Sequence, residues 1–445
     1  MQDLIELILA EDNLEQAIWD VYSNKGAPGV DGMTVYQLKE CFEKNKELIK
    51  TLIRMKQYKP LPVKRVYIPK PNSDKKRPLG IPTVIDRVIQ QAVARVLMDI
   101  YDPKFSNYSY GYRPGRDCHM AVKQALEYLN EGRNKVVDFD IEKFFDTVNH
   151  DKLISILRET VKDDTTLHLI RAFLKAGVME EGLVGPTEEG LPQGGPLSCV
   201  LSNVYLDKLD KELERRELAF VRYADDFCIY VKSDKAAERV LVSVSSWIER
   251  KLFLKVSATK TKIVPPTQSE YLGFGFWKGA DGWKCRPLPS RKARLIDKIR
   301  AVTCRRKAAA MPIFVTVSKA NSIVKGWINY YGVGSMMGFM KKFGAWMRHR
   351  IRVVFIKQWK TPQAIMRKLK WFCNHHNLRF SDFDLYRVAH SSRGLYAKAN
   401  NDIVNCILSP DILEEKIRVK VKGENKTVYP GLVNPVKYYS HMHDL

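Results

Sequence analysis

The sequence predicts an α+β protein whose last third is mostly helical. Segments of strand and helix character alternate from about residue 20 to residue 285, and helical spacing of apolar residues dominates after that. The chain carries 74 Lys and Arg against 50 Asp and Glu, a formal net charge of +24. With 445 residues, 45% of them hydrophobic, it is long enough for about two to four domains.

The positive charge favours a polyanionic partner, most simply nucleic acid, with an anionic membrane as the competitor. No apolar run of about 18 residues exists to span a bilayer. Residues 1–6 show no basic region followed by an apolar stretch, so no secretory signal is visible. The eight cysteines form no CxxC pair, which argues against structural zinc and disulfides. We expect a cytoplasmic (bacterial cytoplasm or nucleoid) protein without a membrane partner; its oligomeric state stays open.

The N-terminal part is expected to hold helices on either side of a loop. Residues 3–22 have helical apolar spacing, residues 24–32 are dense in turn formers, and residues 34–37 resemble a capping box. Residues 63–69 and 77–81 read as two strands of a hairpin with its tip at residues 72–74. A helix over residues 84–100 follows, with Thr83 as its N-cap.

Further along, the expected elements are a strand over 135–141, helices over 150–176, 197–217 and 236–252, and a short strand over 271–276. Two basic runs follow. Residues 284–307 contain ten Lys or Arg and one acid, and residues 341–370 contain ten and no acid, with aromatic residues interleaved. For any single basic residue in these runs, a place on a solvated helix face over an aromatic core is explanation enough. For the runs as a whole, we favour a positively charged surface that binds a phosphate backbone.

A pair of acids, Asp225 and Asp226, interrupts an apolar stretch over residues 220–231 that reads as strand, tight turn, strand. Two adjacent carboxylates against apolar neighbours need positive charge, and a divalent metal is the natural candidate. Asp138 and Asp140 lie in another apolar strand and could supply the third carboxylate of a two-magnesium site. The plain alternative is strand-end carboxylates in salt bridges.

The segment 223–226, Tyr-Ala-Asp-Asp, resembles the YxDD signature of reverse transcriptases. Four more blocks, in the family's order, resemble group II intron-encoded reverse transcriptases (maturases): residues 110–116, 140–145 with Asn149 and His150, 191–198, and 271–274. The resemblance covers residues 4–360 well and the last 80 loosely. It implies a right-hand polymerase: fingers and a palm with an antiparallel sheet, then an α-helical thumb and a small helical C-terminal region.

The resemblance also implies a division of the chain and of the active site. The expected parts are 1–82 (N-terminal extension and fingers), 83–285 (catalytic fingers and palm), 286–360 (helical thumb, or domain X) and 361–445 (C-terminal DNA-binding region). Catalytic metal ligands would be Asp140, Asp225, Asp226 and the backbone of Ile141, for Mg²⁺ with Mn²⁺ as a substitute. Asp138 lies outside the family's catalytic position and is expected to be structural.

Other residues take implied roles in binding substrate. The dNTP contacts would be Lys70 and Arg77 on the triphosphate, Phe145 against the sugar, where it excludes a ribose 2′-hydroxyl, and Gln193 and Lys260. Ser257 stands where family members often have Asn. The template and primer contacts would be Lys64, Arg65, Arg113, Arg116, Tyr223, Arg291, Lys292, Arg348 and Arg350. For Arg113 and Arg116 a structural salt bridge is an equal alternative.

The loop at 24–32 matches an N-terminal insertion of the family and would lie over the template. Cys373 to His376 has no CxxC partner, so we expect no endonuclease domain. The expected function is RNA-dependent DNA synthesis, with intron RNA, a DNA or RNA primer, dNTPs and target DNA as partners, serving splicing and retrohoming. Three alternatives stay open: a domesticated relative in DNA repair or phage defence, a splicing-only RNA-binding maturase, and an RNA-dependent RNA polymerase, which Phe145 disfavours.

Overall fold

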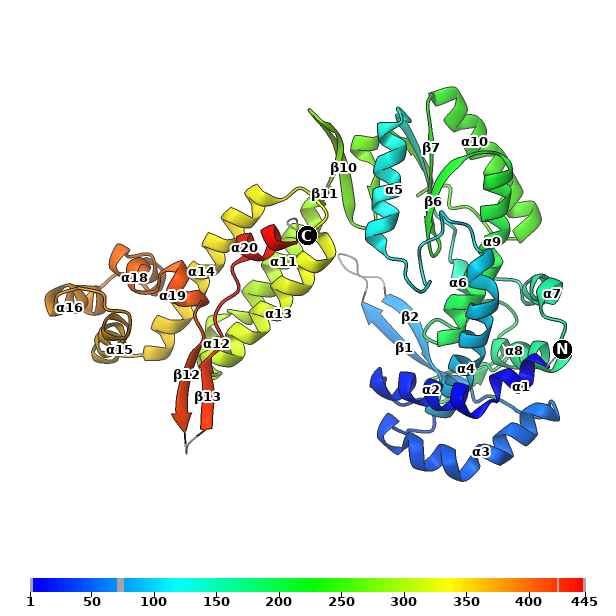
Figure 1. Cartoon of the computed structure of the whole chain (residues 1–445), viewed down its shortest axis with the longest axis horizontal. Helices are drawn as coiled ribbons and strands as arrows, with labels where there is room; N and C mark the ends of the chain where they lie inside the picture. Colours follow the sequence, from blue (N-terminus) through cyan, green and yellow to red (C-terminus); the bar gives the residue numbers. More distant parts are fainter. Residues whose placement is uncertain (1–2, 70–75, 422–423, 443–445) are drawn as a thin grey trace. The chain divides into compact units, whose positions relative to one another are not determined.

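The computed structural model describes residues 3–69, 76–421 and 424–442. The chain divides into two compact units, Met1–Ser269 and Glu270–Leu445 (Figure 1). The expected four-part division of the chain stays a prediction. Among the described helices, none has the length and apolar character that crossing a membrane requires.

The first unit begins with helices that follow the expected pattern with one break. The predicted helix over 3–22 is two helices, α1 (Leu4–Ile8) and α2 (Glu11–Ser23). The capping box at Thr34 is confirmed and opens a 3₁₀ turn (Val35–Gln37) that leads into α3 (Leu38–Arg54). Helix α4 (Val84–Tyr101) begins where predicted, because the Thr83 side chain accepts a hydrogen bond from the Asp86 backbone N–H. A 3₁₀ turn, Asp102–Lys104, follows it.

A four-stranded sheet of order β2-β1-β4-β5 contains the predicted hairpin. Strands β1 (Val63–Pro69) and β2 (Lys76–Ile81) are antiparallel, with Ile68 opposite Arg77. Strands β4 (Val178–Glu180) and β5 (Leu183–Gly185) extend this sheet. The expected hairpin tip and Lys70 lie outside the described residues.

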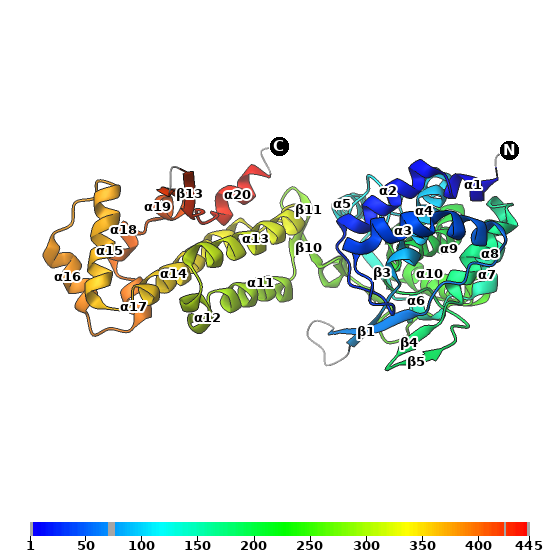
Figure 2. The same cartoon turned by 90° about the horizontal axis from the view of Figure 1, so that it is seen from below.

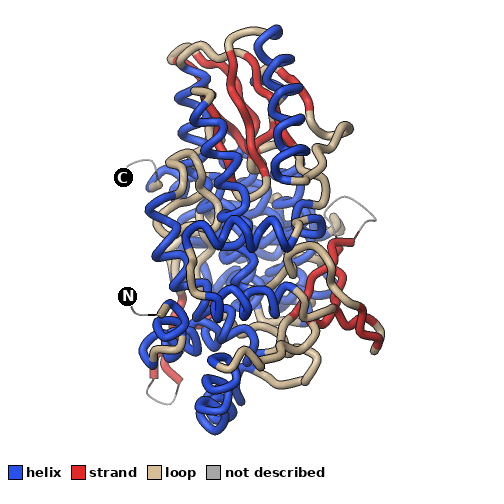
Figure 3. Tube along the Cα trace, turned by 90° about the vertical axis from the view of Figure 1, so that its right-hand side faces the viewer, coloured by secondary structure: helices blue, strands red, loops and turns tan. Residues whose placement is uncertain are grey.

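A second sheet, of order β6-β7-β3-β8, carries the acid pair; Figure 3 shows its strands in red with helices alongside. Its strands are β3 (Lys135–Phe139), β6 (Ala219–Tyr223), β7 (Asp226–Val231) and β8 (Lys262–Val264). Helix α5 (Cys118–Asn130) packs on β6 and β7, α10 (Asp234–Trp247) packs on β3 and β8, and α9 (Pro196–Arg215) packs on β6. All neighbouring strands are antiparallel, as expected for the palm.

Two predicted helices are interrupted. Residues 150–176 form α7 (His150–Thr160) and α8 (Asp164–Leu174), because the Asp163 side chain accepts from the Thr165 N–H and starts a new helix. The predicted helix over 236–252 is α10 followed by a π-turn, Ile248–Leu252. A one-turn helix, α6 (Phe144–Thr147), and a 3₁₀ turn, Pro266–Gln268, complete the unit.

The second unit starts with a small sheet of order β11-β10-β9. Its strands are β9 (Glu270–Tyr271), β10 (Phe274–Gly279) and β11 (Gly282–Pro287), so the predicted strand over 271–276 is two strands. Four helices follow: α11 (Pro289–Val302), α12 (Arg305–Ala310), α13 (Ile313–Tyr331) and α14 (Met337–Trp359). Figure 2 shows α13 lying beside α11 and α14.

The C-terminal residues are helical with one added ribbon. The helices are α15 (Pro362–His375), α16 (Asp382–His390), α17 (Leu395–Ala399), α18 (Asp402–Ile407), α19 (Pro410–Glu414) and α20 (Pro435–His441). Strands β12 (Ile417–Val421) and β13 (Glu424–Tyr429) form an antiparallel pair that the sequence did not predict. Helix α20 packs against α13 and α14.

Candidate active site

Strand register brings the three carboxylates together. Tyr223 of β6 pairs with Asp226 of β7, so Ala224 and Asp225 form the tight turn between these strands. Phe139 of β3 lies opposite Phe227 of β7 in an antiparallel ladder, and their rings stack with centroids 4.7 Å apart. In that register the residue after Phe139 meets the residue before Phe227. Asp140 and Asp226 therefore leave the same end of the sheet.

A buried ion pair lies beside this turn and is hydrogen-bonded to its backbone. Arg222 and Asp210 are both 0% exposed, and Arg222 donates to the two Asp210 oxygens at 2.7 and 2.5 Å. The same guanidinium donates to Asn203 Oδ1 at 3.0 Å and to the Ala224 carbonyl at 2.9 Å. Ala224 has φ 58°, a left-handed conformation that costs energy for a residue with a Cβ. Sequence reasoning missed this support; the signal was a lone charge inside an apolar strand.

A second segment of the chain, which contains Gly111, packs against the backbone of this turn. A Cβ on Gly111 would overlap the backbone nitrogen of Ala224 and lie 3.0 Å from the Tyr223 carbonyl carbon. The Gly111 carbonyl accepts from Asn203 Nδ2 at 2.9 Å. The preceding residues run along β6, since the Tyr110 N–H donates to the Arg222 carbonyl. A glycine is needed because backbone meets backbone here.

A cavity of about 760 Å³ opens at this end of the sheet and collects most of the predicted catalytic and dNTP residues. Its lining includes Asp140, Ile141, Asp225, Asp226, Arg77, Phe145, Gln193 and Lys260. Asp138 is absent from the lining; it accepts hydrogen bonds from Cys228 and Ser269, which is consistent with the structural role expected of it. Phe145 packs edge-on against Phe144, with centroids 5.2 Å apart.

The loop before α9 approaches the fingers hairpin closely. The Gly80 N–H donates to the Gln193 carbonyl at 2.6 Å, and Gly194, with φ 123°, passes so close to the Gly80 carbonyl that no side chain fits. The Gln193 side chain is thereby held at the cavity wall, where its amide lies 3.5 Å from Asp146 Oδ1. On the other side of the loop, His150 contacts the Gly190 carbonyl at 2.7 Å.

The N-terminal loop reaches the same cavity. Asn24 and Gly26 line it together with Arg87 of α4. The Arg87 guanidinium donates to the Ala27 carbonyl at 2.6 Å, and Gly29 packs on the backbone of Thr83. The expectation that this loop lies over the template stays a prediction. Sequence reasoning did not identify Arg87, because it carries no motif signal.

The acid pair carries electrostatic strain. Burial, with repulsion from Asp225 and Asp140, raises the pKa of Asp226 to about 6, although its side chain keeps an open path to solvent. Burial also raises the pKa of Asp225, against a lowering by Arg77. At this end of the sheet, burial and mutual repulsion therefore both disfavour the charged form of the carboxylates.

Asp140 is engaged by Lys260, whose ammonium lies 3.0 Å from both carboxylate oxygens. Within the described ranges, no three His, Cys, Asp or Glu side chains form a ready metal-binding group. The donor chemistry nevertheless fits an oxygen-preferring divalent cation, because three carboxylates border one cavity and two have raised pKa values. Ser257 contributes a backbone N–H to the Asp140 carbonyl at 2.8 Å.

Several predicted template and primer residues lie outside the cavity. Lys64 and Arg65 are on β1 and Tyr223 is on β6. Arg113 is nearly buried and donates to Asp102 Oδ1 at 2.6 Å and to two backbone carbonyls, which favours its structural alternative. Arg116 donates to the Asn107 carbonyl and side chain.

The remaining predicted contacts belong to the second unit. Lys292 and Arg291 are on the first turn of α11, and Arg348 and Arg350 are on α14. Arg350 is held by Thr303, through its hydroxyl and carbonyl at 3.0 Å, and by the Tyr396 hydroxyl. The Arg350 guanidinium is thus hydrogen-bonded to other residues of the second unit. Lys292, in contrast, borders a cavity of the same unit.

Comparison with known proteins extends this picture. Residues 68–276 match the family described as reverse transcriptase (RNA-dependent DNA polymerase). Residues 292–372 match the maturase-specific domain of group II introns. The first match contains the three carboxylates, and the second runs from most of α11 to most of α15.

Two curated relatives and one solved structure are similar to this chain. Protein YkfC of Escherichia coli (strain K12) is 34% identical over 303 residues, covering 59% of this chain and 79% of the relative. Group II intron-encoded protein LtrA of Lactococcus lactis subsp. cremoris is 31% identical over 440 residues, covering 78% and 73%. A chain of the solved partial Cas6-RT-Cas1–Cas2 complex is 26% identical and covers 56% of this chain and 43% of its own, with a TM-score of 0.37, too low to support an argument. The chain belongs to the group II intron-encoded reverse transcriptases, with a reverse transcriptase domain followed by a maturase domain.

Proposed function

We propose that the cavity at the end of the β6-β7-β3-β8 sheet is a two-metal site for DNA synthesis on an RNA template. The observation that supports it is the shared lining: Asp140, Asp225 and Asp226 border one space with Arg77 and Phe145. Two Mg²⁺ ions held by these carboxylates and the Ile141 carbonyl, with Mn²⁺ as a substitute, would activate the primer 3′-hydroxyl and stabilise the leaving pyrophosphate.

The protein's own groups would position the nucleotide. Arg77 reaches the cavity from β2 and suits a bidentate phosphate contact, with Lys70 as a further triphosphate contact. Phe145 faces the cavity where a ribose 2′-hydroxyl would be excluded, and Gln193 lies on the loop that Gly194 brings close to β2. Lys260 would leave Asp140 when a metal ion binds and turn to the triphosphate.

The proposed partners are intron RNA as template, a DNA or RNA primer, dNTPs and target DNA. We assign the N-terminal extension and fingers to 1–82, the catalytic core to 83–285, the thumb to 286–360 and DNA binding to 361–445. Lys64, Arg65, Tyr223, Arg291, Lys292 and Arg348 are proposed contacts to template or primer. Arg113, Arg116 and Arg350 are kept as weaker proposals, because each already has partners within the protein.

Primer extension tests the site. The full chain is given a primer on poly(rA), dNTPs and Mg²⁺, and Asp225→Asn/Asp226→Asn is compared with wild type. Loss of at least about a thousandfold is expected, because the variant removes two carboxylate charges from the proposed metal site. The control is Asp151→Asn, an exposed acid on α7 paired with Arg171. Synthesis retained by the double variant refutes the assignment. Intron splicing by the same variant shows whether RNA binding works without catalysis.

A further inference from the structure

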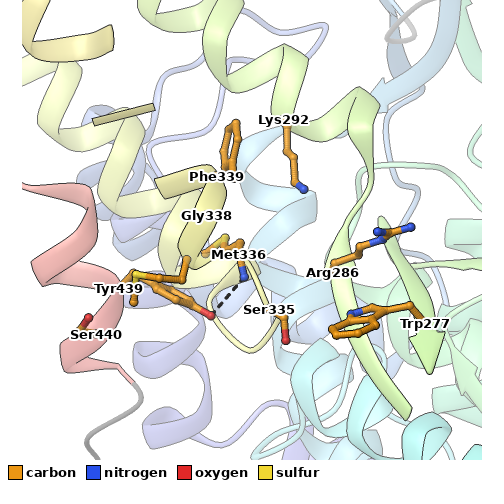
Figure 4. A pocket seen from close by; sticks show the side chains of 10 residues that line it. Trp277, Arg286, Lys292, Ser335, Met336, Gly338, Phe339, Tyr439 and Ser440 are labelled. Carbon is orange, nitrogen blue, oxygen red and sulfur yellow. Dashed lines mark hydrogen bonds between the residues drawn. The ribbon is translucent and has the colours of Figure 1, made fainter. Parts of the chain in front are cut away.

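A second cavity, of about 680 Å³, lies wholly within the second unit and shares no lining residue with the catalytic cavity. Its walls come from β10, β11, the first turns of α11 and α14, and α20 (Figure 4). This volume is within the range of about 300–1,000 Å³ that small ligands occupy in proteins. The cavity is therefore large enough for a nucleotide.

Apolar and aromatic side chains form much of the wall. They are Trp277 from β10, Met336, Met337 and Phe339 at the start of α14, and Tyr439 from α20. Figure 4 labels Trp277, Met336, Phe339 and Tyr439 among the side chains that line this space. The Trp277 indole nitrogen is shielded from solvent and has no hydrogen-bond partner in the described part of the chain. Because that nitrogen is shielded, the part of Trp277 that suits a base is the flat face of its ring, on which a base can stack.

Two cations border the same space. Arg286 on β11 and Lys292 on α11 line it, and among the described residues neither has a carboxylate partner. The Lys292 ammonium lies over the Phe339 ring, 5.3 Å from its centroid. Burial, and then the charge of Arg286, lower the pKa of Lys292. The two cations therefore lie close enough to repel each other. Hydroxyls of Ser335 and Ser440 complete the polar lining.

A cavity lined by both aromatic rings and cations favours a ligand that has an apolar part and a negative charge. A phosphate would compensate Arg286 and Lys292, whereas a free phosphate would leave the Trp277 and Phe339 faces uncovered. A nucleotide carries both parts. The same segment, residues 284–307, holds ten Lys or Arg and one acid, a charge that would attract the phosphates flanking such a nucleotide.

We propose that this cavity holds one unpaired nucleotide of an RNA strand, its base against Trp277 and its phosphate on Arg286 and Lys292. The inference rests on the proposed binding of RNA and adds a specific site to it. Sequence-specific recognition of RNA mostly targets unpaired nucleotides, because side chains cannot read the deep, narrow major groove of duplex RNA, whereas an unpaired base is free to stack on an aromatic ring. An acidic peptide is the alternative occupant that the test must reject.

Site-directed photo-crosslinking tests the site with the full chain. The probe is a hexauridylate that carries one 4-thiouridine, and mass spectrometry locates the cross-linked peptides. Cross-links are expected on peptides containing Trp277, Phe339 or Tyr439. Trp277→Leu should lower that yield about tenfold, the scale of one lost stacking contact. Lys292→Gln should lower it about tenfold as well, because a charged hydrogen bond to phosphate is lost.

The matched control is Lys298→Gln, which removes one exposed cation from the same helix outside the cavity. It should change the yield less than twofold, and thermal melting verifies that all three variants fold. Cross-links only at other peptides, equal yields for Lys292→Gln and Lys298→Gln, or displacement by an acidic peptide but not by unlabelled hexauridylate would each overturn the proposal. Primer extension by the wild type, run in parallel, reports separately on the polymerase and does not depend on where the probe cross-links.

Discussion

The buried pair beside the turn that carries Asp225 gives the sharpest prediction. Asp210→Asn removes the charge that compensates Arg222, while both side chains stay 0% exposed. An uncompensated charge left in the interior costs about 3–5 kcal/mol, because neither water nor a partner then solvates it. At about 2–4 °C per kcal/mol for domains of 150–250 residues, the melting temperature should fall by at least about 6 °C.

The same change should also loosen the turn that carries Asp225. Arg222 donates to the Ala224 carbonyl at 2.9 Å, and Ala224 has a left-handed φ of 58° that the surroundings must maintain. We therefore expect primer extension, measured well below the melting temperature, to fall more than tenfold even when the variant is folded.

Thermal and urea unfolding provide the assay, with a double-mutant cycle through Arg222→Met. If the pair acts as a unit, the double variant Asp210→Asn/Arg222→Met should lose at least about 2 kcal/mol less than the sum of the single variants. The control is Asp164→Asn, which breaks an exposed pair with Arg158 at 3.1 Å and should cost no more than about 1 kcal/mol. Additive losses, or a loss from Asp210→Asn as small as the control's, would refute the reasoning.

Three further predictions follow from the same site. Gly111→Ala should reduce primer extension at least about tenfold because its Cβ overlaps the Ala224 backbone, whereas Gly326→Ala, in an open helical position of α13, should stabilise by about 0.5–1 kcal/mol. Burial lowers the pKa of His150, so near pH 6.5 the unfolded chain binds a proton that the folded protein does not bind. The contribution of His150 to stability is therefore full above pH 6.5 and should be lost progressively below it. In urea unfolding, His150→Gln should make the free energy of unfolding less dependent on pH. Phe145→Ala should raise the use of NTPs relative to dNTPs in competition assays, and unchanged discrimination would remove Phe145 from the sugar contact.

Much of the fold could be predicted from the sequence, because helix starts and strand patterns depend on residues that are only a few positions apart. Thr83 caps α4 and Thr34 opens a capping box where expected, since both motifs depend on side chains a few residues away. The helix breaks inside 3–22 and 150–176 were missed because apolar spacing continues across them. Asp163 caps the start of a new helix in the second segment, whereas the residue before α2, Ala10, makes no side-chain cap. The β12–β13 ribbon was missed because its segment is polar and short.

The family, the acid pair at a strand–turn–strand tip and the basic second half could all be predicted from the sequence, because they are properties of residue type and order. Only the tertiary structure placed Asp140 opposite Asp226, since that depends on the register of β3 against β7, which are far apart in the chain. It also decided that Arg222 and Asp210 meet beneath the turn, that Arg113 is engaged by Asp102, and that Arg286 and Lys292 share a cavity. Charges act through distance and burial, and those arise only when distant segments pack together.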